Sequence, residues 1–151
     1  MSLQEKLKSD LLEAVRGRDE VRRSVLRLLR AGIQNEEIAK RRPLKEEEVL
    51  DLLSREAKRH KESIAEFRKG NRLDLVEREE AELALLLEYM PRQMSPEEIL
   101  EVARQVMGEV GAQGPGDRGK VMGRLMPQLK GRADGKEVSQ IVGELLSALS
   151  E

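Results

Sequence analysis

The sequence contains no cysteine and a single histidine, His60. The absence of cysteine excludes disulfide bonds, thiolate metal ligands and a cysteine nucleophile. One imidazole alone does not favour a histidine-based metal site or a histidine-centred catalytic triad. Adjacent acids such as Glu36 and Glu37 point in different directions around a helix, so they are poor candidates for a paired general acid and base. We therefore expect no catalytic residue, no metal and no cofactor, and we expect His60 to be a hydrogen-bonded residue at the edge of a helical core.

Aromatic residues are almost absent, since the chain has one tyrosine, one phenylalanine and no tryptophan. A single-stranded nucleic acid would find no row of stacking platforms here. Any RNA would have to be recognised through its backbone, its shape and the ends of helices. Strong helix formers dominate instead, namely leucine, glutamate, arginine, alanine and lysine, and they predict an all-α protein.

Long apolar runs are missing as well. No stretch approaches the roughly 20 apolar residues that a membrane helix needs, and residues 1–6 carry no apolar targeting core. We therefore expect a cytoplasmic protein with no membrane partner. The net charge is −1 at pH 7, so any site for a polyanion has to come from an uneven distribution of charge.

Helical periodicity predicts four helices in the first part of the chain. They cover about residues 2–17, 20–41, 45–69 and 71–89. Ser2 and Glu5 have the spacing of a capping box, and Asn71 is expected to open the fourth helix. Val21 and Leu28 belong to the predicted buried face of the second. Short connections between these helices favour an antiparallel bundle or a long helical hairpin.

Residues 90–94 interrupt the helical pattern and mark a domain boundary. Ser95 and Pro96 then give the strongest helix start in the chain, with a capping residue before proline and an acid at the third helical position. A glycine-rich loop is expected over residues 111–116. A sixth helix follows it over about residues 117–126, with Pro127 inside it or near its end, and the last helix begins at Asp134.

The sequence therefore predicts an N-terminal domain of about four helices over residues 1–91 and a smaller three-helix domain over residues 95–151. Cations are concentrated in the smaller domain. The segment from Arg118 to Lys136 has six cations and one acid, a net charge of +5, whereas residues 95–110 carry a net charge of −3. The cations are Arg118, Lys120, Arg124, Lys130, Arg132 and Lys136. Ordinary solvated side chains explain this cluster as well as a polyanion site does.

Glycines are interleaved with these cations, at Gly119, Gly123, Gly131 and Gly135. Inside a helix each costs about 1 kcal/mol relative to alanine. Gly119 and Gly123 would let a sugar-phosphate backbone approach closely, and the helix start after Asp134 would offer free N–H groups to a phosphate. Close helix packing and a capped turn explain the same glycines equally well. No GxxxxGK[ST] or GxGxxG spacing occurs, so the sequence gives little support for nucleotide binding.

The segment over residues 119–138 reads GKVMGRLMPQLKGRADGKEV and closely resembles the signature of the GatB/YqeY family. Further matches are LQEKL at residues 3–7, SVLRLL at 24–29, IQNE at 33–36, AE at 81–82 and YMP at 89–91, so the resemblance spans essentially the whole chain. The chain is identified as a stand-alone YqeY-like member, and its C-terminal part is similar to the tail domain of the B subunit of the tRNA-dependent amidotransferase. One departure is Asp134-Gly135, where amidotransferase tails often have Asn-Pro; it places a negative charge beside the expected phosphate site.

The resemblance implies an all-helical accessory tRNA-binding protein of translation, related to the amidation of Glu-tRNA(Gln) or Asp-tRNA(Asn). Together with the charge pattern, it leads us to expect tRNA contacts at Arg118, Gly119, Lys120, Arg124, Lys130, Gly131, Arg132, Gly135 and Lys136. In the amidotransferase the ATP- and Mg²⁺-using chemistry belongs to a separate domain that this chain lacks, so we expect no catalysis by the chain alone. One alternative is a component of a carbon–nitrogen ligase with glutamine as amido donor, acting with amidotransferase subunits or an aminoacyl-tRNA synthetase. Another is a helical protein-interaction module that binds no RNA.

A second basic surface is predicted on the second helix. Arg23, Arg27 and Arg30 recur at helical spacing and form one stripe. Such a stripe can track a phosphate backbone. We favour a different interpretation, in which these arginines form ion pairs with acids of the fourth helix. The acids are Glu77, Glu79, Glu80 and Glu82.

Overall fold

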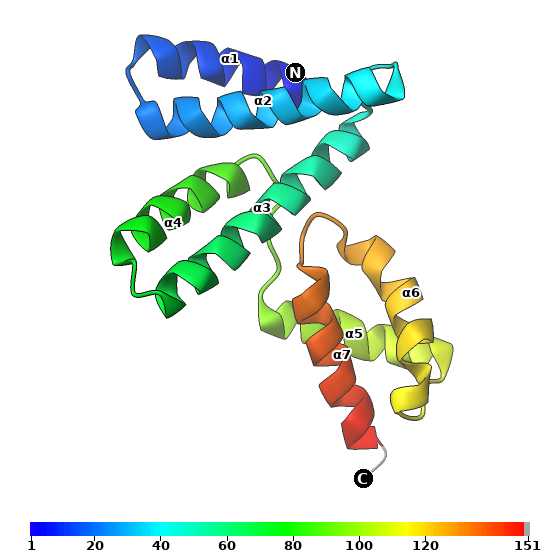
Figure 1. The fold of residues 1–151 in the computed structure, drawn as a ribbon. Coiled ribbons are helices and arrows are strands. Elements are labelled where there is room, and N and C mark those ends of the chain that lie inside the picture. Colours follow the sequence, from blue (N-terminus) through cyan, green and yellow to red (C-terminus); the bar gives the residue numbers. More distant parts are fainter. Residues whose placement is uncertain (150–151) are drawn as a thin grey trace. The chain divides into compact units, whose positions relative to one another are not determined.

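The structure is a computed structural model that describes residues 1–149. Within these residues it contains seven α-helices, one short 3₁₀ helix and no strand, which confirms the predicted all-α class (Figure 1). The helices are α1 (Leu3–Arg16), α2 (Glu20–Lys40), α3 (Glu46–Lys69), α4 (Leu73–Leu87), α5 (Pro96–Val110), α6 (Arg118–Leu129) and α7 (Gly135–Leu149), with the 3₁₀ helix η1 (Pro115–Asp117) before α6. The chain folds as two compact units, unit 1 from Met1 to Pro91 and unit 2 from Arg92 onward. No helix in the described residues is long and apolar enough to cross a membrane.

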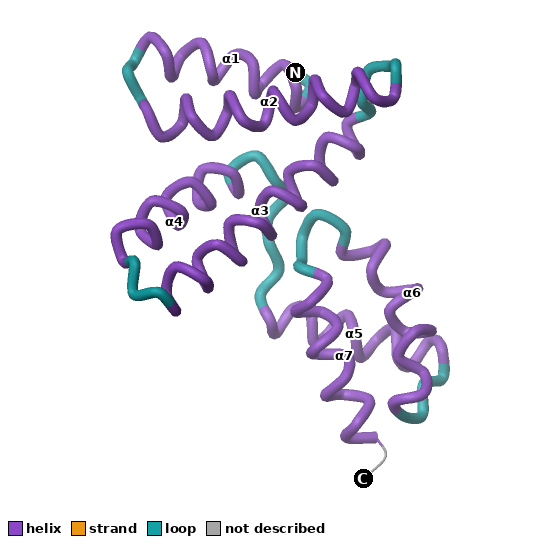
Figure 2. The backbone as a smooth tube through the Cα atoms, in the orientation of Figure 1, coloured by secondary structure: helices purple, strands orange, loops and turns teal. Residues whose placement is uncertain are grey.

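Unit 1 consists of two helical hairpins joined by short turns (Figures 1 and 2). α1 runs antiparallel to α2, α3 runs antiparallel to α4, and α2 packs against both helices of the second hairpin. The predicted capping box of Ser2 and Glu5 is present at the start of α1. Asn71, in contrast, does not open α4: it lies in the turn with φ of 55°, and α4 begins at Leu73. The correction has a local cause, because the short polar side chain of asparagine tolerates this left-handed conformation better than most residues do.

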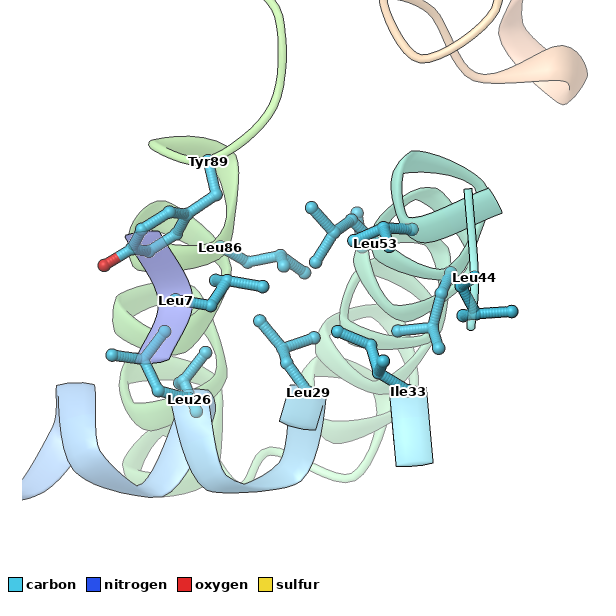
Figure 3. Close-up of a cluster of buried hydrophobic side chains, with 12 residues drawn as sticks. Leu7, Leu26, Leu29, Ile33, Leu44, Leu53, Leu86 and Tyr89 are labelled. Carbon is cyan, nitrogen blue, oxygen red and sulfur yellow. The ribbon is translucent and has the colours of Figure 1, made fainter. Parts of the chain in front are cut away.

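All four helices contribute to one core in unit 1. Leu7 from α1, Leu53 from α3 and Leu86 from α4 are fully buried and meet the apolar face of α2 (Figure 3). The other buried members are Val25, Leu26, Leu29, Ile33, Leu44, Val49, Leu52, Ala57 and Tyr89. Val21 and Leu28, which we expected in this core, are instead exposed, and Leu28 has 65% of its surface accessible. Helical spacing places both at the edge of the apolar face of α2, beside the buried Val25 and Leu29.

Tyr89 closes this core with its phenol group at the edge. Its hydroxyl donates a hydrogen bond of 2.7 Å to Asp10 Oδ2 and accepts one of 3.1 Å from Arg22 Nη1. Burial and the Asp10 carboxylate raise the pKa of Tyr89 to about 12. The native state therefore favours the protonated phenol more than the unfolded chain does, in which the pKa of tyrosine is about 10.

We expect the near-ultraviolet absorbance of the phenolate in the native protein to appear with a midpoint near pH 12. In the denaturant-unfolded protein the midpoint should fall to about 10. Because the folded pKa is the higher one, the stability contributed by this group is complete below about pH 10 and is lost as the pH rises toward 12. The chain has only one tyrosine, so a spectrophotometric titration reports this group alone. Equal midpoints in the two states would contradict the buried hydrogen-bonded phenol.

Unit 2 is built from α5, α6 and α7, which pack against one another in pairs. Its core consists of Ile99, Ala103, Val106, Met107, Val121, Leu125, Leu129, Val138, Val142 and Leu146. Ser95 and Glu98 form the capping box of α5 with Pro96 at the first position, as the sequence predicts. The backbone N–H of Ser95 and the guanidinium of Arg92 hold the pKa of Glu98 below its usual value, which keeps this capping carboxylate charged.

Two boundaries in unit 2 differ from the expectation. The segment before α6 is not entirely loop, because Pro115–Asp117 forms a single 3₁₀ turn; proline supplies the backbone φ angle that the first position of such a turn needs. α6 continues through Pro127 and ends at Leu129, three residues later than predicted.

Candidate nucleic-acid interface

The exposed face of α6 brings together three of the residues predicted to contact tRNA, Gly119, Lys120 and Arg124, and adds Gly123. Val121, Leu125 and Leu129 are buried and fix the opposite side of the helix in the core of unit 2. Helical spacing then turns Gly119, Lys120, Gly123 and Arg124 toward solvent, and all four are exposed. We call these four residues the α6 face.

The two glycines of this face are not required by packing. A Cβ atom added at Gly119 or at Gly123 would meet no other atom within 4 Å. Neither residue is among the glycines with positive φ, which are Gly111 and Gly131. Close approach of another helix therefore does not explain Gly119 and Gly123. Their effect is to leave one turn of helical backbone uncovered beside two cations.

The two cations of the α6 face differ in their partners. The side chain of Lys120 makes no hydrogen bond or ion pair within residues 1–149. Arg124 forms an ion pair with Glu109 of α5, with Nε 3.1 Å from Oε2. Exposed pairs of this kind contribute only about 0–1 kcal/mol, so Arg124 can exchange this carboxylate for a phosphate at little cost.

Arg118 does not join the α6 face. Its Nη2 atom donates to the carbonyl of Ser139 at 2.9 Å and also to the hydroxyl of that residue, so the side chain extends across α7. The guanidinium lies over Gly143, where an added Cβ atom would be 3.5 Å from the guanidinium carbon, an ordinary van der Waals contact. Arg118 therefore links α6 to α7, a role that the charge count did not reveal.

The turn between α6 and α7 is held by the segment that opens unit 2. Gln93 donates its side-chain amide to the carbonyl of Gly131 at 2.9 Å, and the backbone N–H of Met94 donates to the carbonyl of Arg132 at 2.9 Å. Arg132 in turn donates its Nε hydrogen to the carbonyl of Arg92 at 3.0 Å. Gly131 has φ of 78°, a conformation that favours glycine. Gly131 and Arg132 thus serve this clamp.

The start of α7 already has a carboxylate beside it. Asp134 Oδ1 accepts a hydrogen bond of 3.3 Å from the backbone N–H of Lys136. This bond satisfies one of the N–H groups that a phosphate would use and adds a negative charge at the same place. Gly135 packs normally, since its Cβ would lie 3.7 Å from Met126 Cε. The side chains of Lys130 and Lys136 are exposed at the end of α6 and the start of α7.

The basic stripe on α2 is open rather than paired. Arg23, Arg27 and Arg30 form no ion pair within the described part of the chain. The acids of α4 are engaged elsewhere: Glu79 with His60, Glu80 with Arg68 and Glu82 with Arg78. The pairing that we favoured is therefore wrong, because Glu79 and Glu80 contact residues of α3 and Glu82 contacts the preceding turn of α4.

His60 of α3 meets Glu79 and Glu82 of α4, a contact that no local pattern in the sequence predicts. Helical spacing predicts that Glu79 and Glu82 share a face of α4. Which residue of α3 stands opposite them depends on the register of the α3–α4 hairpin, and no local signal fixes that register.

Comparison with known proteins identifies the family to which the chain belongs. Residues 4–146 match the family of YqeY-like proteins. The chain belongs to this family, as its resemblance to the GatB/YqeY signature predicted.

Three curated relatives are all named "Altered inheritance of mitochondria protein 41, mitochondrial". The protein of Lachancea thermotolerans is 44% identical over 85 residues, which are 56% of this chain and 46% of the relative. The protein of Pyrenophora tritici-repentis is 32% identical over 95% of this chain and 80% of its own length. The protein of Saccharomyces cerevisiae is 30% identical over 92% of this chain and 68% of its own length. The match thus spans less than half of the first relative and most of the other two.

These names correct one expectation. A cytoplasmic location was inferred from missing signals, whereas the relatives are named as mitochondrial proteins, so the inference is wrong. The absence of a long apolar run does not identify a cellular compartment, so it was not a sufficient basis for the inferred location.

Proposed function

We propose that this protein is an accessory tRNA-binding protein that holds the RNA backbone on the α6 face. The observation that carries the proposal is the combination of Gly119 and Gly123, both open to solvent, with Lys120 and Arg124 on the same side of the helix. The resemblance of residues 119–138 to the tail domain of the tRNA-dependent amidotransferase supports tRNA as the RNA.

The chemistry of the face suits a sugar-phosphate backbone. Glycine without a side chain lets a ribose or phosphate come close to the helix, and the two cations replace counterions of the phosphates. The chain has too few aromatic residues for base stacking. Recognition would therefore depend on the shape and charge of folded RNA, which is the usual way in which double-stranded RNA is recognised.

Arg23, Arg27 and Arg30 receive a supporting role in this proposal. They form a second row of cations without carboxylate partners in the described residues. A folded RNA is large enough to contact more than one basic surface. We place the main contact on α6 because the uncovered backbone there has no counterpart on α2.

The test is a titration of fluorescently labelled tRNA with the full chain at two salt concentrations. Lys120→Ala/Arg124→Ala should weaken binding and should reduce the steepness of the salt dependence by about 1–2 units, since each lost phosphate contact lowers it by about one. The matched control is Lys58→Ala/Lys61→Ala, which removes the same charge from exposed positions of α3. An unchanged salt dependence in the α6 variant, or an equal loss in the control, would overturn the proposal.

We propose that the bound tRNA is presented to a protein that acts on it, either amidotransferase subunits or an aminoacyl-tRNA synthetase. The family resemblance supports this partner class. An amidation assay with misacylated tRNA, run with and without the chain, measures the effect. Faster amidation at limiting tRNA is expected, and amidation by the chain alone would instead favour an enzyme.

A further inference from the structure

One histidine and two glutamates meet between α3 and α4 in unit 1. His60 comes from α3, while Glu79 and Glu82 leave the same face of α4 because they are three residues apart. His60 Nδ1 lies 2.5 Å from Glu79 Oε2 and 3.8 Å from Glu82 Oε2. One donor atom from each residue falls within a group whose members are all within 4.8 Å of one another.

The three side chains are largely buried. Their exposed fractions are 15% for His60, 22% for Glu79 and 11% for Glu82. Burying two carboxylates is costly unless positive charge lies beside them. Arg78 supplies part of it through a contact of 3.3 Å between its Nε and Glu82 Oε1. Glu79 faces only the imidazole within the described residues.

We propose that His60, Glu79 and Glu82 bind a divalent first-row transition-metal ion. A site with one imidazole and two carboxylates offers mixed nitrogen and oxygen donors, which suit Zn²⁺ and its neighbours in that row. Mg²⁺ and Ca²⁺ prefer oxygen ligands throughout. A divalent cation between the three donors balances both carboxylates at once, which a neutral imidazole cannot do.

The geometry needs only small movements to accept the ion. Ligand atoms at the usual 2.0–2.2 Å from a tetrahedral Zn²⁺ lie about 3.3 Å from one another. The His60–Glu79 contact of 2.5 Å would open by about 0.8 Å and the His60–Glu82 contact of 3.8 Å would close by about 0.5 Å. The donor atoms of Glu79 and Glu82 lie within 4.8 Å of each other, so that separation would close by at most about 1.5 Å. Glutamate side chains have three rotatable bonds through which such changes can be made. Three protein ligands leave at least one further position, which water occupies in open zinc sites.

A proton competes with the metal at this site. A protonated imidazole also supplies positive charge to the two glutamates, whereas metal binding requires the neutral ring. Loading the site therefore releases a proton whenever the imidazole is protonated beforehand, and acidification expels the ion. Acid also releases cations from carboxylates, so the response of the imidazole signals to the metal is what separates coordination by His60 from loose attraction of cations to an acidic surface.

The experiment is a Zn²⁺ titration of the full chain, followed by calorimetry and by NMR of its only imidazole. We expect one ion per chain, a large shift of the imidazole signals and weaker binding at lower pH. Loss of a residue that only supports a metal ligand reduces metal affinity by about 10–100-fold. Glu82→Gln removes a proposed ligand, so it should reduce the Zn²⁺ affinity by more than that. Glu77→Gln is the matched control, since Glu77 is an exposed acid on the same helix.

Three results would overturn the proposal: imidazole signals that do not move, affinity that does not depend on pH, or an equal loss in Glu82→Gln and Glu77→Gln. Glu79→Gln provides a second variant in case Glu82→Gln fails to fold, which circular dichroism establishes. Since no RNA is present, the outcome is independent of the α6 proposal.

Discussion

Replacing Leu86 with alanine is expected to lower the free energy of unfolding of unit 1 by about 2–5 kcal/mol. Leu86 is fully buried where helices of both hairpins meet, so the substitution leaves a cavity that packed neighbours fill only in part (Figure 3). Total stabilities of domains are about 5–15 kcal/mol, so this loss is a large share of the total. Urea unfolding followed by the fluorescence of Tyr89 measures it, because the only tyrosine of the chain lies in this core.

Leu28→Ala is the matched control for this substitution. The same atoms are removed from the same unit, but Leu28 is mostly exposed. We expect a change within about 0.5 kcal/mol. A large loss at Leu28 together with a small loss at Leu86 would mean that Leu28 is buried and Leu86 is not, which would contradict the packing of the two hairpins.

Gly119→Ala/Gly123→Ala is expected to stabilise the protein and, under the proposed function, to weaken its binding of tRNA. Both positions have helical backbone conformations and space for a methyl group, so replacing glycine should gain about 1–2 kcal/mol in total. The two methyl groups would at the same time hold a ribose or phosphate away from the backbone, and the affinity should fall severalfold. Hydrogen exchange of the α6 amides measures the stability, and titration with tRNA measures the affinity.

The two readouts separate the possible reasons for these glycines. A stabilised variant with unchanged tRNA affinity would remove the uncovered backbone from the proposed interface. A destabilised variant would instead mean that packing requires the glycines, contrary to the open space around them. Only a gain in stability together with a loss of affinity agrees with the proposed contact.

Local features of the sequence predicted the local features of the fold. The capping boxes at Ser2 and at Ser95 depend on residues three positions apart, and both are present as predicted. The conformations of turn residues were harder to predict. Asn71 suits a helix start and a left-handed turn equally, so its residue type alone did not predict the φ of 55° that it adopts in the turn.

Features that depend on contacts between helices were not predictable in this way. Periodicity finds the apolar face of α2 but not its edges, so Leu28 was expected in the core. The charge count likewise grouped Arg118 and Arg132 with the binding cations, although the first extends across α7 and the second joins the clamp at Arg92. The meeting of His60 with Glu79 and Glu82 requires the register of two helices, which a single sequence does not reveal.

The α6 face can be tested most directly by NMR of the isotopically labelled full chain during titration with tRNA. The backbone amides of Gly119, Lys120, Gly123 and Arg124 should shift or broaden first, with Arg23, Arg27 and Arg30 following at higher RNA concentration. The buried amides of Val121 and Leu125 on the same helix provide the internal comparison. The proposed function predicts that the largest changes map to the α6 face and weaken at high salt. Changes confined to residues outside α6, or none at low salt, would contradict it.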